Sequence, residues 1–160
     1  MTKLDEATIQ LYEAIKKKDP LKVRQAIENS ADVNTKNNYG QTWLYYAMAF
    51  GNVGVARLLI ENGAEVRGHG VLGEFAAYGR GGAEMAKLLL DAGADIEEAT
   101  SGGYTPLLIA AGRGYTDVVR VFLEAGAYIN AMGTSGKTAK SLAYERGYLD
   151  SAKLIEKYER

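Results

Sequence analysis

Two glycine-rich segments have the residue types and spacing that could bind phosphate. Residues 68–73 read Gly-His-Gly-Val-Leu-Gly, the G-x-G-x-x-G pattern that cradles the pyrophosphate of a dinucleotide. That pattern needs a buried strand before it and a parallel sheet around it. Here the preceding segment, 55–60, has helical periodicity, and the chain offers no set of strands. We therefore interpret these glycines as a turn and expect no nucleotide site.

The second segment, residues 133–138, reads Gly-Thr-Ser-Gly-Lys-Thr and is similar to a phosphate-binding P-loop. A P-loop also needs a glycine five positions before Gly136, where this chain has Ala131. Because the spacing is wrong by two residues, we expect no phosphate site here either.

Side chains that could perform catalysis or bind metals are scarce. The chain has no Cys, and His69 is its single histidine, which excludes thiolate zinc sites, iron–sulfur clusters, cysteine nucleophiles and two-histidine metal sites. Acid–base catalysis would need carboxylates in opposed environments, or a nucleophile beside His69 that a third group orients. Glu97 and Glu98 are instead neighbours in a predicted loop. We predict a protein without enzymatic activity, cofactor or metal.

Composition and charge restrict the class of protein further. The 160 residues suit one domain, and 19 basic against 20 acidic side chains give a net charge of −1. Nucleic acids and anionic membranes attract proteins with a strongly positive net charge, which this chain lacks. No apolar run approaches the roughly 20 residues of a membrane span, and we see no signal peptide. We expect a cytoplasmic protein, monomeric when free, that binds neither nucleic acid nor membrane.

The elements that would position any site are repeated along the chain. A short phrase, small residue–Ala–polar–Val/Ile in most copies, recurs at intervals of 33, 30 and 33 residues, starting at Ser30, Gly63, Gly93 and Gly126. Each copy follows apolar residues at helical spacing, such as Val55, Leu58 and Leu59. A glycine just after the last periodic residue supplies the left-handed conformation that closes a helix. The phrase therefore predicts a helix end in each repeat.

A second, shorter helix is predicted upstream of each phrase. Residues 103–114 show it best, because Thr105 can cap the helix, Pro106 suits its first turn and Gly114 can end it. Similar segments begin at Gly40 and Gly136. The repeating unit is thus a short helix, a tight turn, a longer helix and a glycine-closed loop.

This unit resembles the ankyrin repeat family, which reads G-x-T-P-L-H-x-A-A-x-x-G, then V-V-x-L-L-L, then G-A-D-V-N-A. Residues 101–133 match it closely, with Leu108 in place of His. The resemblance implies an all-α, ankyrin-type solenoid of five stacked helix-turn-helix repeats with short hairpin loops, in one domain covering residues 1–160. The expected repeats are 4–36, 37–69, 70–99, 100–132 and 133–160, with the first and last as caps.

Charge supports these caps, and two departures from the family pattern stand out. Residues 1–36 and 134–160 carry 23 charged side chains in 63 positions, whereas the middle 97 positions carry 16. The third repeat is three residues short and lacks Thr-Pro, so we expect its loop and first helix to deviate. Trp43 replaces the family's proline, which places a large aromatic side chain where it could contact a partner.

In ankyrin-like proteins, the loop tips and first helices form a concave strip that recognises partners. Five repeats would give a strip of roughly 40–50 Å, enough for a standard interface of about 800 Å² per partner. We predict a non-catalytic protein-interaction module that binds a protein or peptide as a scaffold, adaptor or inhibitor. The resemblance implies these contact residues: Tyr39, Gln41, Trp43, Phe50, His69, Tyr78, Arg80, Tyr104, Arg113, Lys137 and Arg146.

Aromatic and arginine side chains dominate that set, as they do the energetic centres of protein interfaces. We expect six of them to converge on the middle of the strip: Tyr39, Phe50, Tyr78, Arg80, Tyr104 and Arg113. An alternative function is small-molecule or sugar binding in an aromatic pocket near the second and third repeats. Its expected lining is Trp43, Tyr45, Tyr46 and Phe50, beside a cleft that the shortened repeat would open.

Overall fold

The computed structural model describes residues 6–37, 39–68 and 70–159. Within these ranges the chain forms ten helices and one isolated antiparallel bridge, between Met132 and Thr138, and no strand. The helices are α1 Glu6–Lys16, α2 Pro20–Glu28, α3 Trp43–Ala49, α4 Val53–Glu61, α5 Val71–Tyr78, α6 Gly82–Asp91, α7 Pro106–Arg113, α8 Thr116–Glu124, α9 Ala139–Glu145 and α10 Leu149–Tyr158. The predicted all-α solenoid is confirmed.

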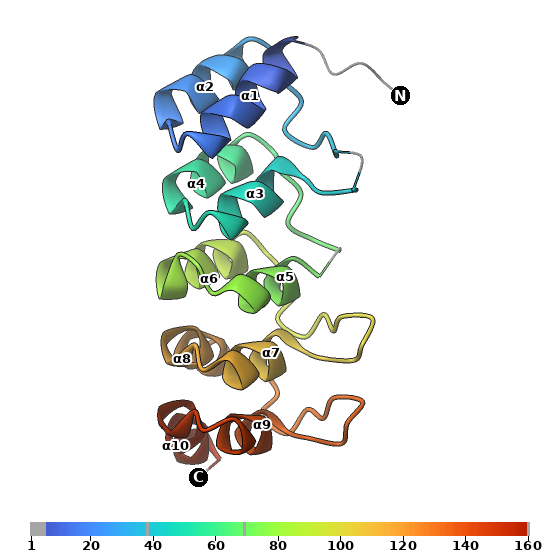
Figure 1. Cartoon of the computed structure of the whole chain (residues 1–160), viewed down its shortest axis with the longest axis vertical. Helices are drawn as coiled ribbons and strands as arrows, with labels where there is room; N and C mark the ends of the chain where they lie inside the picture. Colours follow the sequence, from blue (N-terminus) through green and yellow to red (C-terminus); the bar gives the residue numbers. More distant parts are fainter. Residues whose placement is uncertain (1–5, 38, 69, 160) are drawn as a thin grey trace.

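The ten helices form five pairs that stack into an elongated molecule (Figure 1). Odd-numbered helices make one layer, even-numbered helices make the other, and the long loops project beyond the odd layer (Figure 1). Helix α7 packs against α5 and α9, and α8 packs against α6 and α10. Each pair therefore buries its apolar side chains against its neighbours, and the core is a continuous column that includes Leu44, Phe75, Leu108, Phe122 and Ile155.

The predicted helix boundaries follow from local chemistry. Thr42, Thr105 and Thr138 cap α3, α7 and α9, and each hydroxyl accepts a backbone N–H three residues later. The even-numbered helices α4, α6 and α8 are followed by the glycines that the repeated phrase identified. Gly63, Gly93 and Gly126 have φ values of 90°, 90° and 88°, so these predicted helix ends are confirmed.

Three loops contain the same tight turn, at residues 37–41, 100–104 and 133–137. In each, the first residue's N–H donates to the last residue's carbonyl, at 3.0, 3.0 and 3.1 Å. The glycine in the fourth position donates its N–H back to the first residue's carbonyl, at 2.8–2.9 Å. We call these three segments the loop turns.

The third repeat deviates as expected, and the structure shows which part of the repeat is shorter. Seven positions separate Gly63 from Gly70, the N-cap of α5, whereas twelve separate Gly93 from Thr105. The five-residue difference is the length of one loop turn. The helix pair itself is longer, since 23 positions separate Gly70 from Gly93 against 21 from Thr105 to Gly126. A left-handed Gly70 replaces the capping threonine and offers no side-chain hydrogen bond.

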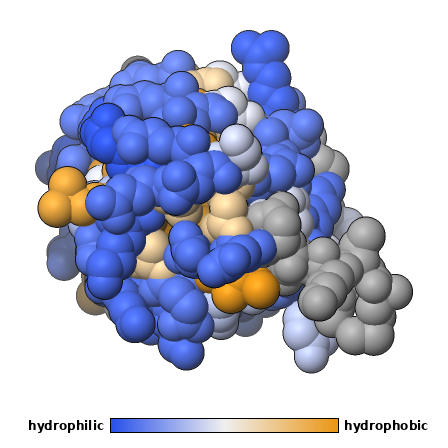
Figure 2. Space-filling model, turned by 90° about the horizontal axis from the view of Figure 1, so that it is seen from above, coloured by the Kyte–Doolittle hydropathy of each residue, from blue (hydrophilic) through white to orange (hydrophobic). Residues whose placement is uncertain are grey.

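The end of the stack at α1 and α2 is covered mostly by hydrophilic side chains (Figure 2). Such a surface is suited to contact with water. None of the helices in the described ranges combines the length and apolar character that a membrane span requires.

Candidate functional site

Four predicted contact residues occupy equivalent places on successive odd-numbered helices. Phe50, Tyr78, Arg113 and Arg146 each lie eight residues after the N-cap of α3, α5, α7 and α9. Tyr78, Arg113 and Arg146 are exposed, and Phe50 is half-buried. They form one row on the surface made by the odd-numbered helices and the long loops, which we call the loop face.

Other predicted residues lie around this row. Tyr39 sits in the first loop turn with 87% of its surface exposed. Gln41 is half-buried, and its Oε1 accepts hydrogen bonds from Asn37 Nδ2 at 2.9 Å and from the Tyr46 hydroxyl at 3.2 Å. Arg80 lies in the turn between α5 and α6, next to the turn glycine Gly51 of the preceding repeat. Arg80 therefore belongs to the turns that join the two helices of each pair.

Trp43 corrects one prediction, because its side chain is only 2% exposed. The indole N–H donates to the Asp32 carbonyl at 3.1 Å, and the ring packs 5.8 Å from Tyr12 and 6.2 Å from Tyr46 between centroids. The aromatic side chain at the first helical position fills space between α1 and α3, so it does not reach a partner. His69, also expected to contact a partner, lies outside the described residues.

Six aromatic rings form a continuous chain of contacts from α1 to α5. Contacting rings lie 5.5–6.2 Å apart between centroids, in the range of favourable edge and tilted packing. Tyr46 is the centre of the cluster and contacts Tyr12, Trp43, Tyr45 and Phe50; Tyr12 also contacts Trp43, and Tyr45 contacts Tyr78. The sequence interpretation missed Tyr12, although it follows the buried Leu11 in the amphipathic helix α1. The cluster holds the exposed end, Tyr78, in a fixed position.

The hydroxyls of Tyr45 and Tyr78 are hydrogen-bonded to each other at the end of this cluster. This bond is the main reason, ahead of burial and the nearby Tyr45 and Glu74 charges, that the pKa of Tyr78 is raised to about 12. The Tyr78 hydroxyl therefore stays protonated at neutral pH, and its bond to Tyr45 ties α3 to α5 on the loop face.

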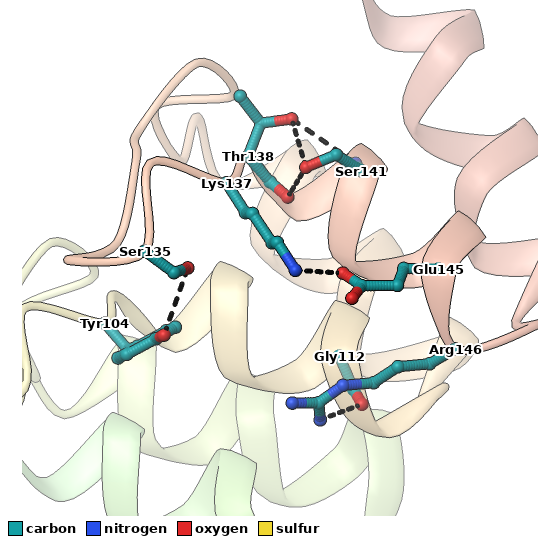
Figure 3. A network of polar contacts seen from close by, with 8 residues as sticks. All are labelled: Tyr104, Gly112, Ser135, Lys137, Thr138, Ser141, Glu145 and Arg146. Atoms are coloured by element: carbon teal, nitrogen blue, oxygen red, sulfur yellow. Dashed lines mark hydrogen bonds and ion pairs between the residues drawn. The ribbon is translucent and has the colours of Figure 1, made fainter.

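Polar contacts connect the last two repeats (Figure 3). The Tyr104 hydroxyl donates to Ser135 Oγ at 3.2 Å, and Arg146 Nη1 donates to the Gly112 carbonyl at 2.7 Å. Lys137 Nζ lies 2.5 Å from Glu145 Oε2 and lowers the pKa of that carboxyl. Three predicted contact residues, Tyr104, Lys137 and Arg146, are thus positioned by bonds within the chain while remaining at the surface.

Two of the cavities that the described residues form open on the loop face. One, of about 280 Å³, lies between the second and third repeats and is lined by Lys36, Tyr39, Gly40, Gln41, Thr42, Leu44, Tyr45, Met48, Glu65, Val71 and Glu74. The other, of about 180 Å³, lies between the fourth and fifth repeats and includes Tyr104, Arg113 and Arg146. A groove of about 480 Å³ between α1 and α2 contains none of the predicted contact residues.

The expected aromatic pocket differs from the one observed. A cavity is present beside the shortened repeat, but of its four expected aromatic residues only Tyr45 lines it. Trp43 is buried in the core, and Tyr46 and Phe50 pack within the aromatic cluster. The described residues also contain no group of three His, Cys, Asp or Glu side chains that could bind a metal. Glu97, one of the two neighbouring loop carboxylates, accepts the Tyr128 backbone N–H at 2.6 Å.

Comparisons with known proteins agree with this architecture. The family described as "Ankyrin repeats (3 copies)" matches residues 3–69 and 74–159. The chain is 37% identical over 110 residues to the E3 ubiquitin-protein ligase Ufd4 of Drosophila melanogaster; this match covers 66% of the chain and 4% of the ligase. It is also 35% identical over 102 residues to the E3 ubiquitin-protein ligase hecd-1 of Caenorhabditis elegans; this match covers 61% of the chain and 4% of that ligase.

A bacterial relative matches a shorter part of the chain. An ankyrin repeat protein of Rickettsia bellii is 40% identical over 67 residues, which is 39% of the chain and 40% of that protein. The chain therefore spans a small part of the two ligases and less than half of the bacterial protein.

Proposed function

Because the chain belongs to the ankyrin repeat family, whose repeats are protein-interaction modules, we propose that it binds a protein or peptide partner through the loop face. In this role the domain is non-catalytic and acts as a scaffold, adaptor or inhibitor. Ligase activity is a property of the two long relatives, of which this chain matches about 4%, and it is not part of the proposal.

The observation that carries the proposal is the exposed row on the odd-numbered helices, with Tyr39 beside it. Tyrosine and arginine are enriched among the residues that supply most interface energy, and here they are exposed at equivalent positions. Contacts within the chain hold several of them in place, as between Tyr78 and Tyr45 and between Arg146 and Gly112. A side chain that is already ordered loses less conformational entropy when a partner binds.

Paired surface variants test the proposal. Tyr39→Ala with Arg113→Ala changes the loop face, and Tyr158→Ala with Arg120→Ala makes the same two changes at exposed positions on α10 and α8. Each protein would be used to capture partners from an extract of the cells that express it, and the captured proteins compared by mass spectrometry.

We expect the loop-face variant to lose, and the α8–α10 variant to retain, the partner that the unmodified protein captures. Far-ultraviolet circular dichroism should show both variants folded, because all four side chains are exposed. Loss of the partner in the α8–α10 variant alone would place the interface on the even-numbered helices and refute the proposal.

A further inference from the structure

The row of loop turns is interrupted after the second repeat. Between the last two repeats, successive turns pack directly, because the Thr134 hydroxyl donates to the Gly102 carbonyl at 3.1 Å and Tyr104 bonds to Ser135. The Tyr104 ring lies so close to Gly133 that a Cβ there would stand 2.8 Å from it. Among the described residues, no second turn packs on residues 37, 39, 40 and 41, because the following loop is five residues shorter.

The base of the shortened loop is nevertheless well ordered by hydrogen bonds. Asn34 Nδ2 donates to the Gly63 carbonyl and the Asn34 side-chain oxygen accepts the Glu65 N–H, both at 2.9 Å. The backbone of Glu65 is thereby fixed at the edge of the interruption. The missing turn leaves a defined hollow, the 280 Å³ cavity described above, which we call the notch.

The notch has an apolar floor and a charged rim. Leu44, Met48 and Val71 form the floor and are at most 6% exposed. Glu65 and Glu74 lie on the rim and are exposed, and Lys36 is the one basic side chain among the described residues of the lining. The described part of the lining therefore combines an apolar surface with two carboxylates and one ammonium group.

We propose that the notch receives an arginine or lysine side chain of the bound partner protein, an inference that rests on the proposed function of the loop face. The methylene stem of such a side chain packs on apolar surface while its cationic end stays at the polar edge. Here the floor accommodates the stem, and Glu65 and Glu74 attract the charge. At about 280 Å³ the notch is slightly below the range of about 300–1,000 Å³ typical of pockets that enclose a small molecule, and it suits one inserted side chain.

A peptide carrying a single basic side chain tests the notch directly. The probe is acetyl-Gly-Gly-Arg-Gly-Gly-amide, titrated into the whole chain with carbon-13 in its methionine methyl groups. Met48 lines the notch, whereas Met132 is 66% exposed in the last loop and serves as an internal control. We expect a saturable displacement of the Met48 signal and none at Met132. The same peptide with norleucine or glutamate in place of arginine should bind at least about tenfold more weakly.

Two charge-neutralising variants show whether the Glu65 and Glu74 carboxylates are responsible for binding the arginine peptide. Glu65→Gln with Glu74→Gln should weaken binding of the arginine peptide about tenfold. Glu61→Gln with Glu124→Gln makes the same change of charge at exposed positions on α4 and α8 and should leave binding unchanged. Equal binding of the arginine peptide by the first variant and by the unmodified chain would overturn the proposal. Maltose tests the alternative of a sugar site: a shift of the Met48 methyl signal with maltose, and none with the arginine peptide, would also overturn it.

Failure of this inference can be distinguished from failure of the proposed function. If the arginine peptide leaves Met48 unchanged while Tyr39→Ala with Arg113→Ala still abolishes partner capture, the notch is refuted and the loop-face interface stands. If the partner binds through the even-numbered helices, the proposed function is refuted whatever the peptide does.

Discussion

Tyr45 and Tyr78 are hydrogen-bonded through their hydroxyl groups although 33 residues separate them in the chain. The bond joins α3 to α5 beside the notch, where no pair of loop turns can connect the second and third repeats. The interface between these repeats therefore depends on ring packing and this bond on the loop face.

Replacing Tyr45 by phenylalanine should lower the pKa of Tyr78 from about 12 toward the ordinary value for tyrosine, because the bond is the largest cause of the shift. The Tyr78 ring carbon signal, followed by NMR during an alkaline titration, measures this pKa. The raised pKa stabilises the fold fully below the ordinary pKa of tyrosine, about 10, and this stabilisation is lost as pH rises toward about 12. An unchanged Tyr78 titration in Tyr45→Phe would contradict the assignment.

Trp43→Ala should lower the free energy of unfolding by about 3–5 kcal/mol, since it empties a buried aromatic site between α1 and α3. Trp43→Phe should cost less because it keeps an aromatic ring, although it removes the hydrogen bond to Asp32. Urea unfolding monitored by circular dichroism gives both values. The control is Tyr39→Ala, which should stay within about 0.5 kcal/mol of the unmodified chain because Tyr39 is 87% exposed. A Trp43→Ala cost as small as the control's would show that Trp43 is not a core residue.

Gly114→Ala and Gly126→Ala separate backbone strain from close packing. Both glycines have a left-handed backbone, with φ values of 75° and 88°, so either alanine should cost about 1–2 kcal/mol. A Cβ on Gly114 would also overlap the Tyr148 ring of the next repeat, whereas a Cβ on Gly126 meets nothing within 4 Å. We expect Gly114→Ala to be the more destabilising by a further 1–3 kcal/mol, roughly, in urea unfolding. Equal losses would mean that the tyrosine ring moves aside without cost.

Features that depend on neighbouring residues in the chain were predictable from sequence. Thr105 caps its helix and Gly93 closes another because the hydrogen bonds and the backbone conformation are local. The burial of Trp43 was not predictable in the same way, because it depends on the space left by Tyr12 in the preceding repeat. The resemblance to the family indicated which positions to expect at the contact surface. It did not distinguish an exposed position in a loop, such as Tyr39, from a buried position at the start of a helix, such as Trp43.

The shape of the shortened third repeat was likewise predictable from the sequence only in part. The three-residue deficit was visible in the spacing of the repeated phrase. Its distribution was not, because a five-residue loss in the loop is partly offset by a longer helix pair. The position of the notch depends on that distribution, and therefore only the folded chain shows that Glu65, Glu74 and Met48 line the same cavity.

Site-specific photo-crosslinking tests the central claim, binding through the loop face, most directly. A photoreactive phenylalanine analogue would replace Tyr39 or Arg113 on the loop face, and Arg120 or Tyr158 on α8 and α10, in the cells that express the protein. The account predicts a covalent adduct with the same partner protein from both loop-face positions and from neither of the other two. Adducts formed only from α8 and α10 would contradict it.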